Sequence, residues 1–309
     1  MQIAFEKWHG CRNDFIVVWQ SDDPLVFASL AKAAPTLCGR RGEGIGADGL
    51  IVLHVRNSRE LVPFKVSIIN SDGSRASTCG NGLRCAVMST LERHRAAGVV
   101  EWPDTLVLDL GTHTVACRTM GKGPSLIAVD MGTPILGPAF EGAKELRAEI
   151  LSILRSRDKE NLAKDMHFCS MPNPHVVILV DQQISRAELL DLGPALQTVR
   201  SGDGINVHFA APKAIPAKDQ GRIANALGGT IEDLYSVLVW ERGAGETAAC
   251  GSGACAVGAA LVATGSAAAA SWIGIEMPGG LLFVRQEAPG EQMTLAGPAV
   301  MTFRGSFPL

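Results

Sequence analysis

Two segments of this 309-residue chain are near copies, and this repetition constrains the fold more than any other feature. The first is Cys79-Gly-Asn-Gly-Leu-Arg-Cys-Ala-Val87, and the second is Cys250-Gly-Ser-Gly-Ala-Cys-Ala-Val-Gly258. Each begins with a cysteine, continues through a Gly-polar-Gly turn and enters a segment of helical character. Because each half of the chain carries one copy, the pair predicts a duplicated architecture with one thiol-headed long helix per half.

The hydrophobic pattern around the two copies fits a mixed α/β duplication. Besides the helices after Cys79 and Cys250, helices are expected over 25–37, 143–155 and 187–199. Strands are expected over 3–5, 15–19, 50–55, 64–70, 105–110, 113–118, 127–131, 176–180, 204–210, 236–240, 275–277, 281–285 and 299–303. A chain of 309 residues favours two domains. We expect an N-terminal domain over 1–118, to which residues 297–309 return, and a C-terminal domain over 119–296.

Composition and charge argue against several classes of protein. The net charge is −3, no long basic stripe is present and aromatic residues make up 5%, which does not suit a nucleic-acid-binding surface. The N-terminus lacks the basic and then apolar pattern of a signal peptide. The weakly polar run over 254–271 consists largely of Ala, Gly and Ser, and indicates a buried helix rather than a membrane span. We therefore expect a cytoplasmic protein whose eight cysteines are reduced thiols.

The position of each cysteine suggests its chemistry. A helix N-terminus lowers the pKa of a nearby thiol through its partial positive charge and its free N–H groups. The neighbouring glycines let the backbone approach a ligand, and the same N–H groups bind a carboxylate. Two such helix ends facing one another across a cleft would remove a proton from one face of a carbon and return it on the other. This arrangement predicts an enzyme that inverts a carbon centre.

The residues around both turns resemble the diaminopimelate epimerase family. The resemblance rests on Asn70-Ser-Asp-Gly-Ser-Arg-Ala-Ser-Thr-Cys79-Gly-Asn-Gly-Leu-Arg84 and on Glu241-Arg-Gly-Ala-Gly-Glu-Thr-Ala-Ala-Cys250-Gly-Ser-Gly-Ala-Cys255. Shorter matches are Gly10-Cys-Arg-Asn-Asp-Phe15, Gly44-Ile-Gly-Ala-Asp-Gly49, Asn173-Pro-His175, Gly204-Ile-Asn206 and Pro278-Gly-Gly280. The resemblance implies two pseudosymmetric α/β domains, each a mixed, mainly antiparallel sheet wrapped around a central helix. It also implies a small-molecule amino-acid substrate and catalysis without pyridoxal phosphate, another cofactor or a metal.

Carried over by position, the resemblance assigns roles to individual residues. Cys79 and Cys250 match the acid–base pair, and His175 and Glu241 match positions that tune the two thiols. Arg242 suits a distal carboxylate, since a guanidinium binds carboxylates in a bidentate way, and Glu241 suits an ammonium group. The full set implied to bind substrate is Asn13, Asn70, Gly80, Asn81, Asn173, Asn206, Glu241, Arg242, Gly251 and Ser252. Cys85 and Cys255 recur in the family on the helices and are read as packing residues, and Cys11, Cys38, Cys117 and Cys169 as structural.

The sequence also departs from the family pattern. Arg12 stands where the motif usually has glycine, and Pro172 replaces the glycine before Asn-Pro-His. Residues 212–233 extend the segment between Asn206 and Glu241 and suit a lid, an oligomer contact or a substrate-specific loop. The substrate expected from the matched residues is LL-2,6-diaminopimelate, converted to the meso form for lysine and peptidoglycan precursors. A racemase of histidine or of a proline derivative is the alternative, and a homodimer is left open.

Parts of the sequence also match three other patterns. The glycines over 44–49 match a dinucleotide-binding pattern, but that motif needs a strand before it and a helix after it, and the expected order is the reverse. The cysteine spacings do not suit a zinc site, although a redox or metal-binding role for the cysteine helices remains a remote alternative. A thiol hydrolase using Cys79 and His175 would leave Cys250 without a role.

Overall fold

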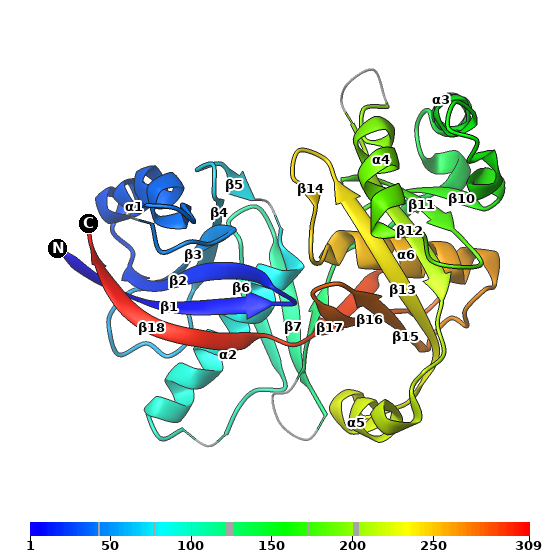
Figure 1. Ribbon diagram of the computed structural model, residues 1–309. Coiled ribbons are helices and arrows are strands. Elements are labelled where there is room, and N and C mark those ends of the chain that lie inside the picture. Colours follow the sequence, from blue (N-terminus) through cyan, green and yellow to red (C-terminus); the bar gives the residue numbers. More distant parts are fainter. Residues whose placement is uncertain (43, 77, 100, 122–125, 172, 200–203) are drawn as a thin grey trace. The chain divides into compact units, whose positions relative to one another are not determined.

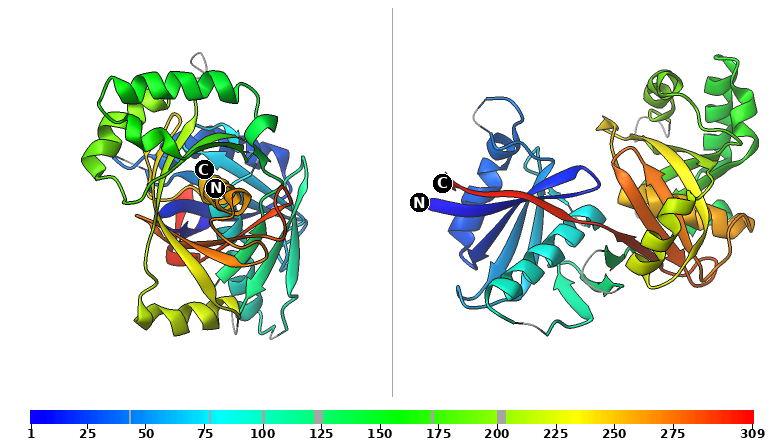
Figure 2. Two further views of the ribbon diagram at one scale, coloured as in Figure 1. Left: turned by 90° about the vertical axis from the view of Figure 1, so that its right-hand side faces the viewer. Right: turned by 60° about the horizontal axis from the view of Figure 1, so that its bottom comes forward.

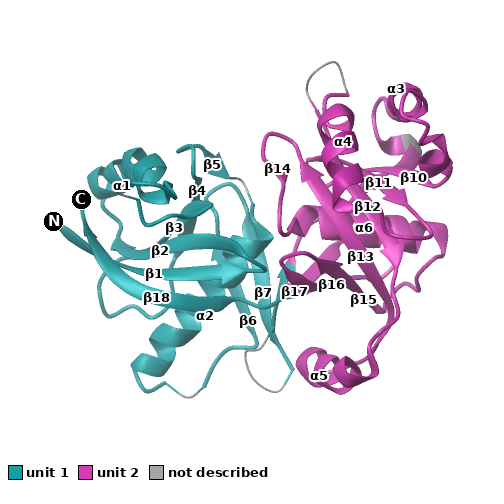
Figure 3. Ribbon diagram, viewed as in Figure 1, with its two compact units in different colours: residues 1–129, 297–309 teal, residues 130–296 magenta. Residues whose placement is uncertain are grey.

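The chain divides into two compact units (Figures 1 and 3). The computed structural model describes residues 1–42, 44–76, 78–99, 101–121, 126–171, 173–199 and 204–309. Unit 1 comprises Met1–Val129 and Gly297–Leu309, and unit 2 comprises Asp130–Ala296. The division falls after residue 129 rather than after 118, because β8 (Leu126–Asp130) pairs antiparallel with β7 (Thr114–Met120). Both units are built from mixed sheets and helices, which agrees with the α/β class expected from the sequence.

Unit 1 contains a six-stranded sheet in the order β18-β1-β2-β3-β4-β5. Its strands are β1 (Gln2–Gly10), β2 (Asn13–Ser21), β3 (Gly49–Val55), β4 (Lys65–Asn70), β5 (Arg75–Ala76) and β18 (Val300–Pro308). A further strand of unit 1, β6 (Thr105–Asp109), pairs with β7 outside this sheet. Neighbouring strands are antiparallel except β2 and β3, which the crossover helix α1 (Pro24–Cys38) connects. β18 lies along β1, so the two chain ends meet in this unit (Figures 1 and 2).

The α-helices of the described part of unit 1 pack on opposite faces of this sheet. Residues Ile16 and Val18 of β2 point toward α1, where Leu30 and Ala34 are buried with them. On the other face lies α2 (Gly80–Ala96), in which every residue from Gly80 to Leu91 is buried. A helix that is buried all round forms the centre of a unit rather than its surface. The expected central helix is therefore present in unit 1.

Unit 2 contains an eight-stranded run in the order β17-β16-β15-β13-β12-β11-β10-β9. The strands are β9 (Ile135–Leu136), β10 (Met166–Ser170), β11 (Pro174–Leu179), β12 (Asn206–Pro212), β13 (Ile231–Glu241), β15 (Trp272–Met277), β16 (Gly280–Gln286) and β17 (Met293–Gly297), with β14 (Gly245–Glu246) paired to β13. Two pairs, β11 with β12 and β13 with β15, are parallel. The remaining pairs that involve β9–β16 are antiparallel, as the fold class predicts for a mainly antiparallel sheet.

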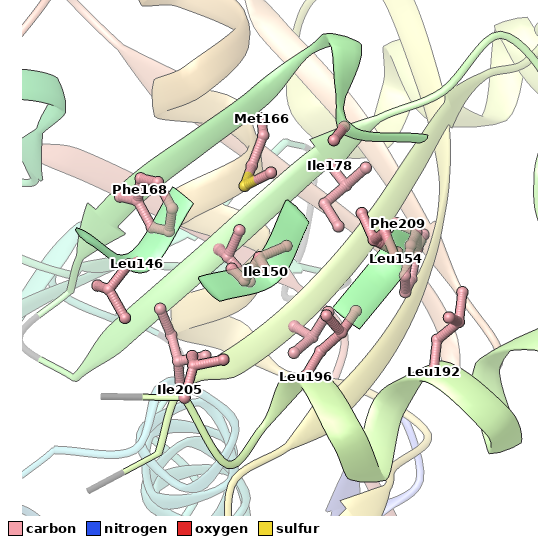
Figure 4. Packing of buried hydrophobic residues seen from close by; sticks show 14 of the residues in the cluster. Leu146, Ile150, Leu154, Met166, Phe168, Ile178, Leu192, Leu196, Ile205 and Phe209 are labelled. Carbon is pink, nitrogen blue, oxygen red and sulfur yellow. The ribbon is translucent and has the colours of Figure 1, made fainter. Parts of the chain in front are cut away.

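Helices cover both faces of the unit 2 sheet. On one face, α3 (Ala143–Arg155) and α4 (Arg186–Leu196) bury side chains such as Ile150 and Leu196 against Ile178 and Phe209 (Figure 4). On the other face, α6 (Gly251–Thr264) is buried from Gly253 through Val262. Because side chains alternate along a strand, residues next to those in the α3–α4 core point toward α6. This alternation places His175 and His208, whose neighbours are core residues, on the α6 face.

The segment over 212–233, for which the sequence suggested a lid, an oligomer contact or a substrate-specific loop, contains a helix. It contains α5 (Ala217–Leu227), an amphipathic helix that buries Ile223 and Leu227 and ends at Gly228 in the left-handed conformation. The sequence did not predict α5, nor β10, whose short run Met-His-Phe-Cys-Ser lacks a clear alternation. The loop over 44–49 follows α1 and precedes β3, which is the reverse of the dinucleotide-binding order, as expected.

None of the helices in the described part of the chain combines the length and the apolar character that crossing a membrane requires. All eight cysteines belong to the described residues and are free thiols. Seven of them are buried, and Cys79 is partly exposed. Burial raises the pKa of the Cys38 thiol to about 11 and that of Cys169 to about 12. Such thiols remain protonated at neutral pH, which suits the packing role expected for them.

Candidate functional site

Cys79 is the N-cap of α2. Its backbone is extended, with φ of −144° and ψ of 103°, and its sulfur accepts the N–H of Gly82 at 3.4 Å. The carbonyl of Cys79 accepts the N–H of Leu83 at 2.8 Å, so the helical bonding pattern starts at this residue. The N–H groups at the first helical positions, Gly80 and Asn81, have no acceptor within the helix. The sulfur of Cys79 thus caps the helix beside two backbone donors.

A network of amide side chains surrounds the sulfur of Cys79. The Oδ1 atom of Asn13 accepts a hydrogen bond from Asn81 Nδ2 at 3.2 Å and lies 4.0 Å from Cys79 Sγ. The Nδ2 atom of Asn13 donates to Asp48 at 2.8 Å, which fixes the orientation of the Asn13 amide. Asn70 instead donates to Ser74 at 2.9 Å in the turn between β4 and β5. The structure therefore brings Asn13, Asn81 and Cys79 together, while the described side-chain hydrogen bond of Asn70 lies within its own turn.

Arg84 is a residue of this site to which the sequence assigned no role. Its side chain is fully buried, and Nη2 donates to the Oδ1 atom of Asn81 at 2.7 Å. Its Nε donates to the carbonyl of Pro298 at 3.3 Å, and among the described residues no carboxylate forms an ion pair with it. A Cβ on Gly10 would lie 2.8 Å from Nη2, so the close approach of this strand requires glycine. An arginine within an otherwise apolar helical segment was the signal that sequence reasoning passed over.

Cys250 caps α6 in the same way as Cys79 caps α2. Its φ and ψ are −126° and 110°, and its sulfur accepts the N–H of Gly253 at 3.3 Å. The sulfur also lies 3.6 Å from the hydroxyl of Ser252, and the backbone N–H of Cys250 donates to the sulfur of Met277 at 3.3 Å. The two near-copies in the sequence thus fold into the same local structure, one in each unit.

The protonation of Cys250 differs from the expectation. The pKa of its thiol is raised well above the ordinary value, first because the group is buried and second because the Glu241 carboxylate lies nearby and accepts its hydrogen bond. The N–H of Gly253 and the hydroxyl of Ser252 act in the opposite direction but do not outweigh burial. The N-terminus of α6 therefore acts in the predicted direction, but the net shift of the Cys250 pKa is upward. In this structure it is a protonated thiol beside a carboxylate.

His175 lies in a buried pair of imidazoles. Its Nδ1 atom lies 2.8 Å from Nε2 of His208, and its Nε2 atom lies 2.9 Å from Oδ1 of Asn173. Burial lowers the pKa of both rings, to about 3 for His208 and well below the ordinary value for His175. His175 is also repelled electrostatically by Arg242 when it is charged. Both rings are therefore neutral at physiological pH.

Asn206 connects two strands of this site through both ends of its amide. Its Nδ2 donates to the carbonyl of Pro174 at 2.9 Å, and its Oδ1 accepts the backbone N–H of Arg242 at 3.0 Å. A Cβ on Gly204 would lie 2.8 Å from Cδ of Arg242, so the arginine stem packs on the glycine. Thr247 donates to Oε1 of Glu241, which orients that carboxylate. Asn206 thus positions Arg242 in addition to any contact with substrate.

Two departures from the family pattern fall near these residues. Arg12 adopts φ of 66° in the turn between β1 and β2, a left-handed conformation that favours glycine, which gives a physical reason for the glycine usual in the family. Pro172 lies outside the described residues. The candidate residues group by unit: Asn13, Asn70, Cys79, Gly80 and Asn81 in unit 1, and Asn173, His175, Asn206, Glu241, Arg242, Cys250, Gly251 and Ser252 in unit 2.

Comparison with known proteins places this architecture among epimerases. Residues 5–136 and 167–302 match the family described as diaminopimelate epimerase. A diaminopimelate epimerase of Carboxydothermus hydrogenoformans is 34% identical over 309 residues, covering 99% of each chain. A PhzF-family phenazine biosynthesis protein of Bacillus anthracis has the same fold, with a TM-score of 0.63, 14% identity and full coverage of both chains. A hydroxyproline epimerase of Agrobacterium vitis, solved with bound trans-4-hydroxy-L-proline, gives a TM-score of 0.58 at 12% identity over 100% of this chain and 93% of that one.

Proposed function

We propose that this chain, which belongs to the diaminopimelate epimerase family, converts LL-2,6-diaminopimelate to the meso isomer. The chain is an amino-acid epimerase and therefore an isomerase. Cys79 and Cys250 are the acid–base pair of the proposed reaction. One sulfur, as a thiolate, takes the proton from the α-carbon, and the electron pair of that C–H bond moves toward the adjacent carboxylate. The other sulfur, as a thiol, gives its proton to the opposite face of the same carbon. No cofactor is needed, since each thiol carries one proton in turn.

The observation that carries this proposal is the shared local structure of the two cysteines. Each sulfur accepts the N–H of the third residue of its helix, at 3.4 Å in α2 and 3.3 Å in α6. The first two N–H groups of each helix, those of Gly80, Asn81, Gly251 and Ser252, are then available to an anion. The negative charge that develops at the substrate carboxylate during proton removal is stabilised by such fixed donors.

The two thiols are not equivalent, and this suits a two-base reaction. Burial and Glu241 keep Cys250 protonated, so this cysteine enters the cycle as the acid. After it has given up its proton, the reverse reaction starts from the Cys250 thiolate, and the roles exchange. Glu241 acts on this cycle by favouring the thiol form of Cys250, and Thr247 holds the carboxylate in place.

The choice of diaminopimelate rests on the second amino-acid head group of that substrate. Arg242 is proposed to bind the distal carboxylate, and Asn206 fixes its backbone through the hydrogen bond to the Arg242 N–H. Asn13, Asn70 and Asn173 are proposed to contribute further hydrogen bonds. A monocarboxylic amino acid lacks the second carboxylate that Arg242 is proposed to bind and should therefore bind less tightly. The requirement for reduced thiols also favours the cytoplasm as the place of action.

Incubation with LL-diaminopimelate in D₂O, with reductant and without added cofactor, tests the proposal. We expect deuterium at the α-carbon of the product together with meso-diaminopimelate. Exchange with histidine or a proline derivative, but not with diaminopimelate, would show that diaminopimelate is the wrong substrate and would leave the two-thiol mechanism in place. Absence of exchange with every amino acid tested, together with stoichiometric bound metal, would overturn the proposal in favour of a metal-binding protein.

A further inference from the structure

A buried histidine outside the proposed acid–base pair, His208, is connected by hydrogen bonds through His175 to Asn173. We propose that His208 is a positioning residue that fixes the tautomer of His175 and thereby directs the amide NH₂ group of Asn173 toward a carboxylate of the substrate. This inference rests on the proposed function, because Asn173 is one of the residues proposed to bind diaminopimelate. His208 lies on β12, two residues beyond Asn206, and sequence reasoning gave it no role.

The three side chains form a single chain of hydrogen bonds. His208 Nε2 lies 2.8 Å from His175 Nδ1, and His175 Nε2 lies 2.9 Å from Asn173 Oδ1. β11 and β12 are parallel neighbours in which His175 pairs with Asn206 and Val177 pairs with His208. The two rings are therefore diagonal neighbours on one face of the sheet, with centroids 5.0 Å apart.

The direction of this chain is visible at Asn173, whose Oδ1 faces His175. An amide oxygen only accepts hydrogen bonds, so His175 Nε2 must carry a proton and donate it to Asn173. A neutral imidazole has one donor and one acceptor, so His175 Nδ1 is then an acceptor and His208 Nε2 is its donor. Both rings have exposures of 0%, and Arg242 opposes a positive charge on His175, so the neutral forms persist.

The position of the His208 ring is fixed by α6. A Cβ on Gly253 would lie 2.1 Å from Cε1 of His208 and 2.8 Å from each ring nitrogen, so the ring fills the space of a side chain at that position. The remaining ring nitrogen, Nδ1, is buried and makes no hydrogen bond within the described structure. An apolar side chain would avoid the cost of burying that atom. What an apolar side chain cannot supply is the donor for His175 Nδ1.

The consequence for the substrate is a choice between two orientations of the Asn173 amide. With Oδ1 held by His175, the two N–H bonds of Nδ2 remain for other partners, and these suit a carboxylate oxygen. The flipped amide would present its oxygen, which suits an ammonium group and repels a carboxylate. Through His175, His208 therefore makes Asn173 a carboxylate-binding residue.

The tautomers are measured directly by long-range nitrogen–proton NMR spectra of the intact protein labelled with ¹⁵N-histidine. We expect His175 to show a protonated Nε2 and an unprotonated Nδ1, and His208 to show a protonated Nε2. A spectrum in which His175 carries its proton on Nδ1, or on both nitrogens at neutral pH, would overturn the proposal. The measurement needs no substrate, so it separates this proposal from the proposed function, which absence of turnover would overturn.

Substitution of His208 tests the effect on substrate. We expect His208→Phe, which keeps a ring but has no donor, to raise KM for diaminopimelate roughly tenfold with a smaller change in kcat, because one hydrogen bond to a carboxylate is lost. His208→Gln retains an N–H donor and should restore part of the KM. His54→Phe is the matched control, since His54 is a buried histidine of unit 1 that bonds to Ser67, and should leave KM unchanged. An unchanged KM in a folded His208→Phe variant would overturn the proposal.

Discussion

The substitution Gly253→Ala tests how tightly the first turn of α6 packs on the buried histidine pair. Gly253 has a helical backbone, so alanine suits its conformation and would by itself stabilise the helix by about 1 kcal/mol. Its new methyl group, however, would lie 2.1 Å from Cε1 of His208. Ordinary contacts between carbon atoms are about 3.5–4.0 Å long, so the ring or the helix has to move by more than 1 Å.

The size of the effect follows from what that movement breaks. Overpacking a well-packed core costs about 1–3 kcal/mol. Displacing His208 also breaks its 2.8 Å bond to His175 between two buried groups, which costs about 1–3 kcal/mol more. The higher helix propensity of alanine offsets about 1 kcal/mol of these costs. We therefore expect Gly253→Ala to destabilise the protein by about 1–5 kcal/mol, which lowers Tm by roughly 2–20 °C for a unit of this size.

Two other glycine substitutions provide matched controls in differential scanning calorimetry. Gly82 occupies the same position in α2, but there a Cβ would meet the flexible ends of Ile51 at 3.3 Å and Ile68 at 3.5 Å, and Cβ of Cys79 at 3.6 Å, so Gly82→Ala should change Tm little. Gly221 lies in α5 with open space around it, and Gly221→Ala should raise stability by up to about 1 kcal/mol. A Gly253→Ala variant as stable as these controls would refute the packing of His208 beneath α6.

Three further outcomes follow from the same geometry. Replacing Cys79 or Cys250 by Ala should lower kcat for diaminopimelate at least about 100-fold, the usual contribution of a general acid or base; a variant that keeps the full rate would show that the pair is wrongly assigned. Because the pKa of Cys250 is raised, its alkylation by iodoacetamide, followed by peptide mass spectrometry, should be slow at pH 7 and accelerate only above pH 9. Fast labelling at pH 7 would contradict the thiol form. The pKa of His208 is about 3 in the folded protein and near 6.5 in the unfolded chain, so at low pH the unfolded chain binds a proton that the folded protein does not. The contribution of neutral His208 to the free energy of unfolding is therefore complete above pH 6.5 and is lost as pH falls toward 3. Urea unfolding should show about 2 kcal/mol less stability at pH 5 than at pH 7 from this group, and His208→Phe should weaken that dependence.

Much of the fold was predictable because its signals are local. The period of apolar residues predicted the helix over 143–155 with the same bounds as α3. Each Cys-Gly-x-Gly turn marked a helix start at the correct residue, since the cap and the helix are adjacent in the sequence. β10 and α5 were missed, because β10 is short and lacks a clear alternation and α5 lies in a segment for which the sequence suggested only a loop, a lid or an oligomer contact. The return of residues 297–309 to unit 1 followed from the late strand signal.

The chemistry of the site was less predictable, because it depends on residues distant in the sequence. A helix N-terminus is visible in the sequence, but the burial of Cys250 and the approach of Glu241 are not, and these reverse the direction of its pKa shift. His208 and His175 lie 33 residues apart on neighbouring parallel strands. Strand pairing and register decide that they meet, and neither is readable from one sequence.

The pairing of β1 with β18 has a consequence for synthesis on the ribosome. Glu6 and Arg304 contact each other across 298 positions of the chain. Unit 2 is one continuous segment, so it can fold soon after it leaves the exit tunnel. The edge of β1 that β18 covers stays open until β18 has been made, and an unpaired edge strand is a site of aggregation. Translation speed through unit 2 therefore sets how long a nascent chain exposes that edge, and slow stretches there would prolong dependence on chaperones.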